Sequence, residues 1–209
     1  MVYDFTNNWF DQYAKNVWNN LVPQAKPQKI LEVGSYEGAS ACFLIEALSN
    51  ENEIEIHCVD TWEGSIENFP DGVPNVNMRN VESRFDHNVK LAISKVEKPV
   101  NLVKHKSFSD VSLSKMIGDG KKQYFDFVYI DGSHQAPDVL CDAVLAFRLL
   151  KTGGIMVFDD YLWAENLPYG FDPIRCPKLA IDSFVNIYFR KLKVLQAPLY
   201  QLYIQKISD

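Results

Sequence analysis

The chain has 209 residues, about the size of one globular domain. Hydrophobic residues make up 47% and charged residues 23% of the chain, which excludes collagen-like, coiled-coil and intrinsically disordered proteins. The formal net charge of −6 argues against nucleic-acid and membrane partners, because phosphate backbones and anionic lipids attract an excess of positive charge. We therefore expect one core-forming domain over residues 1–209.

The cysteines and the N-terminus indicate in which cellular compartment the protein is located. The four cysteines are far apart, form no CxxC pair and mostly lie in apolar runs, where a thiol packs as a small hydrophobic group. The first ten residues carry acids and amides instead of the positive charge and long apolar run of a signal peptide. These features predict a reducing, cytoplasmic location.

The first predicted element is an amphipathic helix that ends near Pro23. Its apolar positions are Trp9, Phe10, Tyr13, Val17 and Leu21. We expect residues 1–27 to form a helical cap packed on a core of residues 28–209. A lid over a substrate site is the alternative interpretation of this helix.

Short β-rich runs then alternate with helical patterns, which is typical of a parallel sheet with helices on both faces. The predicted strands cover residues 29–35, 55–60, 100–107, 125–131 and 154–159. The predicted helices cover residues 39–49, 76–94, 137–150 and 177–190. Because Ser or Asp stands at the ends of these strands, polar groups should gather at the carboxyl edge of the sheet.

Two closely spaced runs at 192–196 and 200–205 follow the last predicted helix. A connection that short cannot cross over between parallel strands, so these runs should form an antiparallel hairpin. Two long irregular stretches, 62–75 and 161–176, each follow a strand end, where open α/β sheets bind ligands. We expect a doubly wound, Rossmann-like α/β fold whose ligand site is walled by these stretches and the N-terminal helix.

The turn after the first predicted strand has the sequence EVGSYEGAS, beginning at Glu32. Its glycines would let the backbone approach a ligand, and the helix N-terminus that follows favours negative charge. The GxxxG spacing departs from the GxGxxG of dinucleotide sites. Asp60 ends the second strand and could accept both hydroxyls of a ribose. A structural turn and a solvated strand-end aspartate are the alternative interpretations.

The segment LEVGSYEGAS resembles motif I of class I S-adenosylmethionine-dependent methyltransferases, and VDTWEGS resembles the acidic motif that follows it. The resemblance continues through YIDGSH to GGIMVFDDY. More narrowly, the chain resembles metal-dependent O-methyltransferases of the catechol type and of the sugar and macrolide type. This resemblance implies a seven-stranded sheet that is mostly parallel, with an antiparallel C-terminal strand.

The same resemblance implies that S-adenosylmethionine is the cofactor. Asp60 would hold its ribose, Ser107 and Phe108 would flank its adenine, and Asp131 would contact its amino group as well as a metal. The full set of residues expected at the cofactor is Glu32, Gly34, Ser35, Tyr36, Ser40, Asp60, Thr61, Trp62, Ser107, Phe108 and Asp131.

Three acids, Asp131, Asp159 and Asp160, end two neighbouring predicted strands. Their clustered charge is costly without a cation, and hard oxygen ligands suit Mg²⁺, with Ca²⁺ or Mn²⁺ as alternatives. Asp is also common at strand ends as a cap or turn former. Catechol-type enzymes commonly have Asp-Asn where this chain has two acids, which favours a sugar-like substrate over a catechol.

His134 follows Asp131 by three residues, at the position where matching family members place their proton acceptor. Imidazole titrates near neutrality, so we expect His134 to act as a general base with Asp131 beside it. A turn or surface role is the alternative. The other histidines, His57, His87 and His105, have no acidic or nucleophilic neighbour in a motif and are expected to be structural.

The predicted reaction is methyl transfer from S-adenosylmethionine to a hydroxyl of a small molecule, assisted by a divalent metal. Aromatic residues in the two long stretches suggest a ring-bearing or sugar-like acceptor, or simply well-packed loops; they are Phe69, Tyr161, Trp163, Tyr169 and Phe171. A non-catalytic or metal-independent S-adenosylmethionine-binding protein of the same fold is the alternative. The oligomeric state stays open, and a homo-oligomer is one option.

Overall fold

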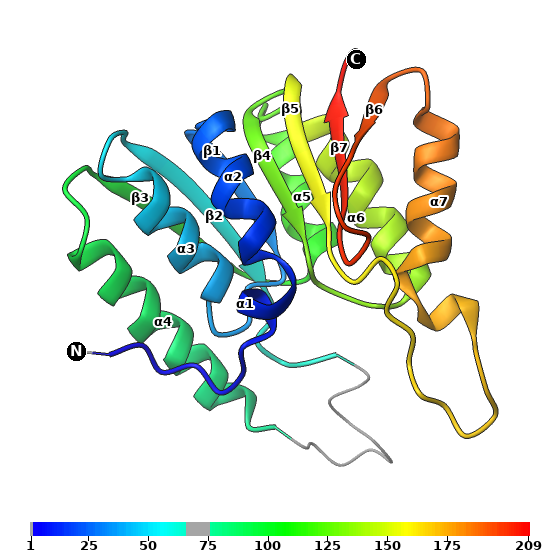
Figure 1. Ribbon diagram of the computed structural model, residues 1–209, viewed down its shortest axis with the longest axis horizontal. Coiled ribbons are helices and arrows are strands. Elements are labelled where there is room, and N and C mark those ends of the chain that lie inside the picture. Colours follow the sequence, from blue (N-terminus) through cyan, green and yellow to red (C-terminus); the bar gives the residue numbers. More distant parts are fainter. Residues whose placement is uncertain (1, 66–75) are drawn as a thin grey trace.

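The computed structural model, which describes residues 2–65 and 76–209, is built around a seven-stranded sheet with the strand order β3-β2-β1-β4-β5-β7-β6 (Figure 1). The strands are β1 (Lys29–Val33), β2 (Ile54–Asp60), β3 (Val100–Lys106), β4 (Phe125–Ile130), β5 (Leu150–Phe158), β6 (Leu192–Leu195) and β7 (Leu202–Lys206). The first five are parallel, and β7 is antiparallel to both β5 and β6. The predicted Rossmann-like sheet and terminal hairpin are confirmed.

Helices cover both faces of this sheet (Figure 1). One face carries α1 (Trp9–Tyr13), α2 (Lys15–Ala25), α3 (Ala39–Leu48) and α4 (Met78–Ser94). The other carries α5 (Ser109–Gly118), α6 (Ala136–Leu149) and α7 (Pro177–Tyr188), with a short 3₁₀ helix, η3 (Pro173–Arg175), before α7. The central strands β1 and β4 are almost entirely buried, which explains their near-continuous apolar sequences.

The N-terminal segment differs from the single helix predicted there. It forms two helices that meet at Ala14, and α2 continues through Pro23 to Ala25. Pro23 cannot donate a backbone hydrogen bond to the carbonyl four residues earlier, yet it lies inside α2, two residues before the helix ends. The helix is terminated by its capping residue Lys26, which adopts a left-handed φ of 43° while its N–H bonds to the Val22 carbonyl.

Helix α5 was absent from the predicted elements. Its buried side chains are few, namely Ser112, Leu113 and Met116, while Val111 is exposed, so the apolar pattern is weak. The feature of the sequence that could have predicted α5 was the placement of its charges. Asp110 in its first turn and Lys115 in its last turn both complement the helix dipole.

Helix α2 is attached to the sheet by Trp18, which is completely buried. Its ring meets Phe127 and Tyr129 of β4 edge-on, at centroid distances of 5.3 and 4.9 Å. Its indole N–H lies 3.1 Å from both Gln201 Oε1 and the Tyr203 hydroxyl. The N-terminal helices and the C-terminal strand therefore share one buried cluster over the centre of the sheet.

The backbones that follow β1 and β4 lie unusually close together. Gly34 has φ of +83°, and a Cβ atom at this position would lie 1.9 Å from the Asp131 carbonyl oxygen. The Asp131 N–H donates to the Val33 carbonyl at 2.7 Å. Only glycine fits here, and it brings the turn after β1 against the segment that carries Asp131.

Two of the histidines form a pair between β2 and β3, in which His57 is buried and His105 is half-buried. His57 Nδ1 lies 2.8 Å from His105 Nε2, the rings stack at 5.0 Å, and Glu55 Oε1 lies 2.7 Å from His57 Nε2. Burial lowers the pKa of both imidazoles. The charges of His57 and Lys121 also lower the pKa of His105, which falls to about 4.

Acid should therefore destabilise the fold through this pair. An unfolded histidine has a pKa of about 6.5, so between pH 6.5 and 4 the unfolded chain binds more protons than the folded chain. The free energy of unfolding should thus fall as the pH decreases through this range. In urea titrations at pH 7.5 and 4.5, His105→Gln should lose less stability than the wild type, by about 1 to 3 kcal/mol. The control is His87→Gln at an exposed position, and equal acid losses in all three proteins would contradict the expectation.

Candidate functional site

The carboxyl edge of the sheet holds two groups of polar residues, of which the first is organised by Glu32. This carboxylate, near the end of β1, is fully buried and accepts hydrogen bonds of 2.5 Å from the hydroxyls of Ser35 and Ser40. Burial raises the pKa of Glu32, and the two hydroxyls oppose that rise. Glu32 thus fixes the turn after β1 from the protein interior, through its hydrogen bonds with Ser35 and Ser40.

Asp60, at the end of β2, ties that turn to the next loop. Its Oδ2 accepts the backbone N–H groups of Ser35 and Tyr36, both at 2.9 Å, and its Oδ1 accepts that of Trp62 at 2.7 Å. Each carboxylate oxygen has two lone pairs. Three of these four positions are used, so Asp60 can keep its bonds and still accept one hydroxyl group from a ligand, at Oδ1.

The side chain of Trp62, two residues after Asp60, packs inward. Trp62 is buried, donates its indole N–H to the Tyr36 carbonyl at 2.9 Å, and packs on Phe85 with centroids 4.9 Å apart. The Thr61 hydroxyl accepts the Glu63 N–H at 3.1 Å. In this arrangement Trp62 supports the backbone of the first turn, and its ring is covered.

The two residues expected at an adenine follow β3. The Ser107 N–H donates to the Asp60 carbonyl at 3.1 Å, which brings this loop beside the second one. Phe108, immediately before α5, is 64% exposed. The loops after β1, β2 and β3 are therefore joined through Asp60, and a large aromatic side chain at their edge faces solvent.

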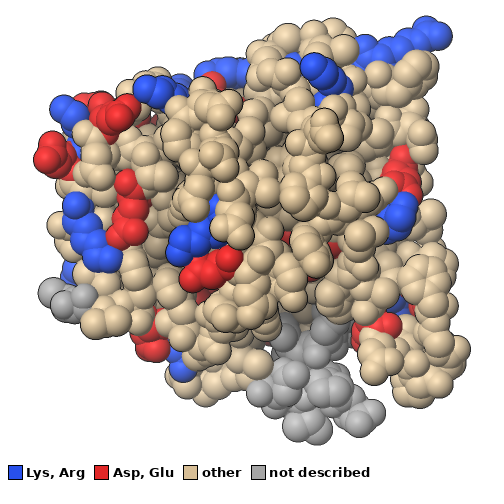
Figure 2. Space-filling model, in the orientation of Figure 1, with Lys and Arg blue, Asp and Glu red and all other residues tan. Residues whose placement is uncertain are grey.

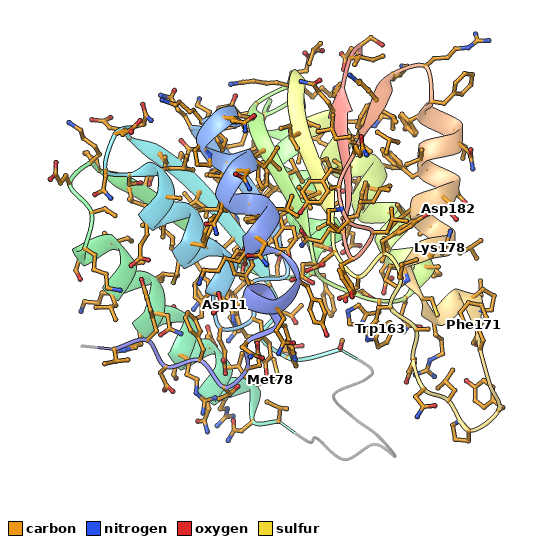
Figure 3. All side chains as sticks on the ribbon, in the orientation of Figure 1. Asp11, Met78, Trp163, Phe171, Lys178 and Asp182 are labelled. Carbon is orange, nitrogen blue, oxygen red and sulfur yellow. The ribbon has the colours of Figure 1, made fainter. Side chains whose placement is uncertain are left out.

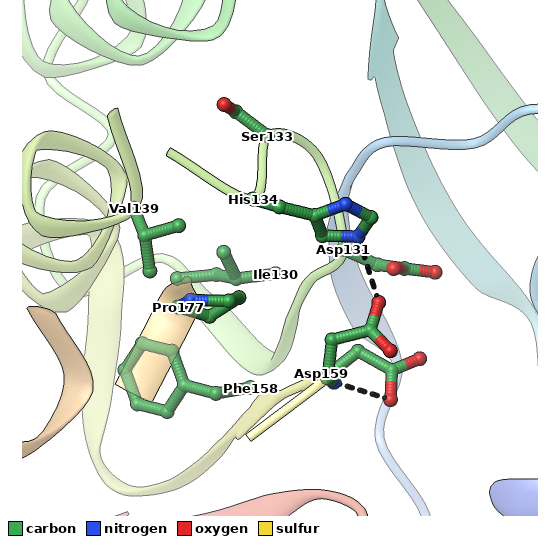
Figure 4. Close-up of a pocket in the computed structure, with 9 residues that line it drawn as sticks. Ile130, Asp131, Ser133, His134, Val139, Phe158, Asp159 and Pro177 are labelled. Atoms are coloured by element: carbon green, nitrogen blue, oxygen red, sulfur yellow. Dashed lines mark hydrogen bonds and ion pairs between the residues drawn. The ribbon is translucent and has the colours of Figure 1, made fainter. Parts of the chain in front are cut away.

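The second polar group is the acid cluster, formed by Asp131, Asp159 and Asp160 at the ends of β4 and β5 (Figure 4). Each can offer one oxygen, and these oxygens lie within 4.8 Å of one another. Burial and the repulsion of the neighbouring acids raise the pKa of Asp131, and that of Asp159 to about 6. Among residues 2–65 and 76–209, no other triad of possible metal ligands lies this close together. The donor set fits a hard divalent cation, whose charge would offset the repulsion.

His134 stands at the rim of the acid cluster. Its Nε2 lies 2.9 Å from Asp160 Oδ2, and its ring lies 4.1 Å from the ring of Trp163. Asp160 has a left-handed φ of 54°, which is uncommon for a residue with a side chain. A small pocket separates these polar groups from the core, and its apolar lining consists of Ile130, Val139, Phe158 and Pro177 (Figure 4).

Tyr129 was not among the predicted site residues. Its buried hydroxyl lies 3.0 Å from Asp131 Oδ2 and also hydrogen-bonds Asp159 Oδ2. Burial and these two carboxylates raise the pKa of Tyr129 well above its usual value, so the hydroxyl keeps its proton. In the sequence, an aromatic residue in an apolar strand indicates core. The available signal was the two-residue spacing, which places Tyr129 and Asp131 on the same side of the strand.

The segment between β5 and α7 overhangs this end of the site, with Trp163 and Phe171 on it (Figure 3). Trp163 packs on His134, whereas Tyr169 and Phe171 are both 70% exposed. Arg175 clamps the segment through hydrogen bonds of 2.6 and 2.8 Å to Glu165. The predicted wall residue Phe69, and most of the stretch 62–75, lie outside the described residues.

On the face shown in Figure 2, basic and acidic side chains are interspersed. None of the helices in the described ranges combines the length and apolar character needed to cross a membrane.

Comparison with known proteins points to one family. The family model described as "Methyltransferase domain" matches residues 31–161. A curated relative, the "Probable caffeoyl-CoA O-methyltransferase 3" of Dictyostelium discoideum, is 25% identical over 144 residues, which is 68% of this chain. The match covers 47% of that relative, so the chain spans about half the relative's length.

Solved structures share the fold at low sequence identity. An O-methyltransferase from Bacillus cereus in complex with SAH has a TM-score of 0.63 at 16% identity, covering 99% of this chain and 84% of that one. An O-methyltransferase from Streptomyces achromogenes in complex with SAM has a TM-score of 0.62 at 16% identity, covering 93% and 79%. Because the family model spans more than half of the sequence and includes both polar groups at the sheet edge, this chain belongs to the methyltransferase domain family.

Proposed function

We propose that this protein transfers the methyl group of S-adenosylmethionine to a hydroxyl group of a small molecule. The observation that carries the proposal is the contact of Gly34 with the Asp131 backbone. It brings the turn expected to hold the cofactor against the acid cluster expected to hold the acceptor. The names of the relatives, which are O-methyltransferases, support oxygen as the accepting atom.

In this reaction the acceptor oxygen attacks the methyl carbon. The new C–O bond forms as the C–S bond breaks, S-adenosylhomocysteine leaves, and the acceptor's proton moves to His134. Asp160, 2.9 Å from His134 Nε2, stabilises the positive charge that the imidazole then gains. Asp60 and the turn after β1 hold the cofactor, so that much of the barrier is removed by positioning.

We further propose a divalent cation, with Mg²⁺ favoured, at Asp131, Asp159 and Asp160. The closeness of these carboxylates, whose oxygens lie within 4.8 Å of one another, supports it, because a cation would offset the repulsion that, together with burial, raises the pKa of Asp131 and Asp159. When bound, such an ion would bind and acidify the acceptor hydroxyl. The alternative is a metal-independent or non-catalytic S-adenosylmethionine-binding protein.

The acceptor class is proposed to be sugar-like or ring-bearing. Trp163 beside His134 offers a flat apolar face at the site, and the exposed rings of Tyr169 and Phe171 lie on the same segment. The pair of adjacent acids, where catechol-type enzymes commonly have Asp-Asn, favours the sugar-like acceptor.

Replacing Asp60 by Ala should weaken the binding of S-adenosylmethionine and S-adenosylhomocysteine by about 1.5 to 3 kcal/mol, the scale of hydrogen bonds to a charged group. Isothermal titration calorimetry measures the affinities, and thermal melting checks the fold, because Asp60 also holds three backbone N–H groups. The matched control is Glu63→Ala at an exposed position of the same loop. Equal losses in both variants, or tight NAD binding without any response to S-adenosylhomocysteine, would contradict the cofactor assignment.

The proposed metal site can be tested without knowing the acceptor. Calorimetry with Mg²⁺ and Mn²⁺ should show binding to the wild type and a marked loss in Asp159→Asn, which removes one charged ligand. The control Asp182→Asn changes an acid on α7 that pairs with Lys178 (Figure 3) and should bind like the wild type. Identical titrations for all three proteins would refute the site.

Replacing His134 by Gln should lower the methylation rate by about 10²- to 10⁴-fold, the usual contribution of a positioned general base. Cofactor affinity should stay unchanged. Rates would be measured with the best acceptor from a panel of glycosides and catechols. The wild-type rate should rise with pH as the base loses its proton, and the variant should lose that rise. If His134→Gln kept both its turnover and its pH profile, with His87→Gln as reference, the proton would go elsewhere.

A further inference from the structure

The hydroxyl of Tyr129 is a shared partner of two acids that lie far apart in the sequence. Asp131 follows β4 and Asp159 follows β5, yet one oxygen of each is hydrogen-bonded to Tyr129. The side chain of Tyr129 is 1% exposed. It therefore contacts the acid cluster from the protein interior, on the side away from solvent.

A buried amide sets the direction of these hydrogen bonds. Gln201 Oε1 accepts the indole N–H of Trp18 at 3.1 Å and also accepts the Tyr203 hydroxyl. Its other end, Nε2, lies 3.4 Å from the Tyr129 oxygen. An amide nitrogen can only donate, so the Tyr129 oxygen accepts from Gln201 and its proton is directed toward a carboxylate.

The Tyr129 ring has little freedom to move. The indole of Trp18 packs edge-on against it, with centroids 4.9 Å apart, and Trp18 is itself completely buried. A fixed ring with a directed proton is a rigid support for the side chains that it contacts. Without that support, the repulsion between the two carboxylates would favour their separation.

We propose that Tyr129 is a positioning residue that holds the carboxylates of Asp131 and Asp159 in place for a divalent cation. The inference rests on the proposed metal site and deepens it, because it assigns a structural cause to the arrangement of the ligands. Groups that hydrogen-bond metal ligands in this way typically change metal affinity by about 10- to 100-fold when they are removed.

The test compares Tyr129→Phe with Tyr203→Phe by calorimetric titration with Mn²⁺ and Mg²⁺. Both variants lose one buried hydroxyl of the same hydrogen-bonded network, but only Tyr129 bonds to acids of the cluster. We expect the dissociation constant to rise about 10- to 100-fold in Tyr129→Phe. In Tyr203→Phe it should stay close to the wild-type value. S-adenosylhomocysteine affinity and thermal melting check that each variant is folded.

The outcomes separate this inference from the proposal on which it rests. If the wild type binds neither ion, the proposed metal site fails and the inference with it. If the wild type binds and Tyr129→Phe binds equally well, or both variants lose affinity alike, the metal site stands and the role of Tyr129 is overturned. Should Tyr129→Phe not fold, Gln201→Met keeps both rings and removes the directing amide. We expect Gln201→Met to lose less metal affinity than Tyr129→Phe would, and wild-type metal affinity in Gln201→Met would overturn the inference.

Discussion

The backbone contact between Gly34 and Asp131 is the constraint on which the site depends. Parallel neighbours β1 and β4 both end at the same edge, and the absence of a side chain at Gly34 lets the two following segments touch. On one side of that contact lie the turn held by Glu32 and the loop held by Asp60. On the other side lie the acid cluster and His134. A larger residue at position 34 would separate these two groups of polar residues.

The second feature of the site is that its buried polar groups would cost free energy of folding if they lacked hydrogen-bond partners. Each of the two halves has an interior support. Glu32 is bonded by two serine hydroxyls, and the acid cluster is bonded by Tyr129, which is in turn supported by Gln201. Buried polar groups persist only where their hydrogen bonds are made, and satisfied networks are rigid. Rigid supports suit a reaction in which the geometry of attack contributes much of the rate.

The sequence was a good guide to the sheet and a partial guide to the site. Alternation of apolar strands and amphipathic helices predicted the strand succession and the terminal hairpin, because burial on both faces leaves a clear pattern. Helix α5 buries too few apolar side chains to leave one. Gly34 suggested a close approach to a ligand, whereas its nearest neighbour is the Asp131 carbonyl, a contact set by the pairing of β1 with β4. Tyr129 was missed because a strand aromatic looks the same whether its hydroxyl meets an acid or not.

The buried cluster around Trp18 joins residues that lie more than 180 positions apart in the sequence, so the interior of the site depends on both segments. A chain of residues 1–160 contains every predicted cofactor and metal residue. It lacks Gln201 and Tyr203, so the indole N–H of Trp18 and the hydroxyl of Tyr129 lack those partners. Strand β7, which follows β6 in the chain, lies between β5 and β6 in the sheet. The interior support of the acid cluster therefore depends on a segment that follows all of its acids in the sequence.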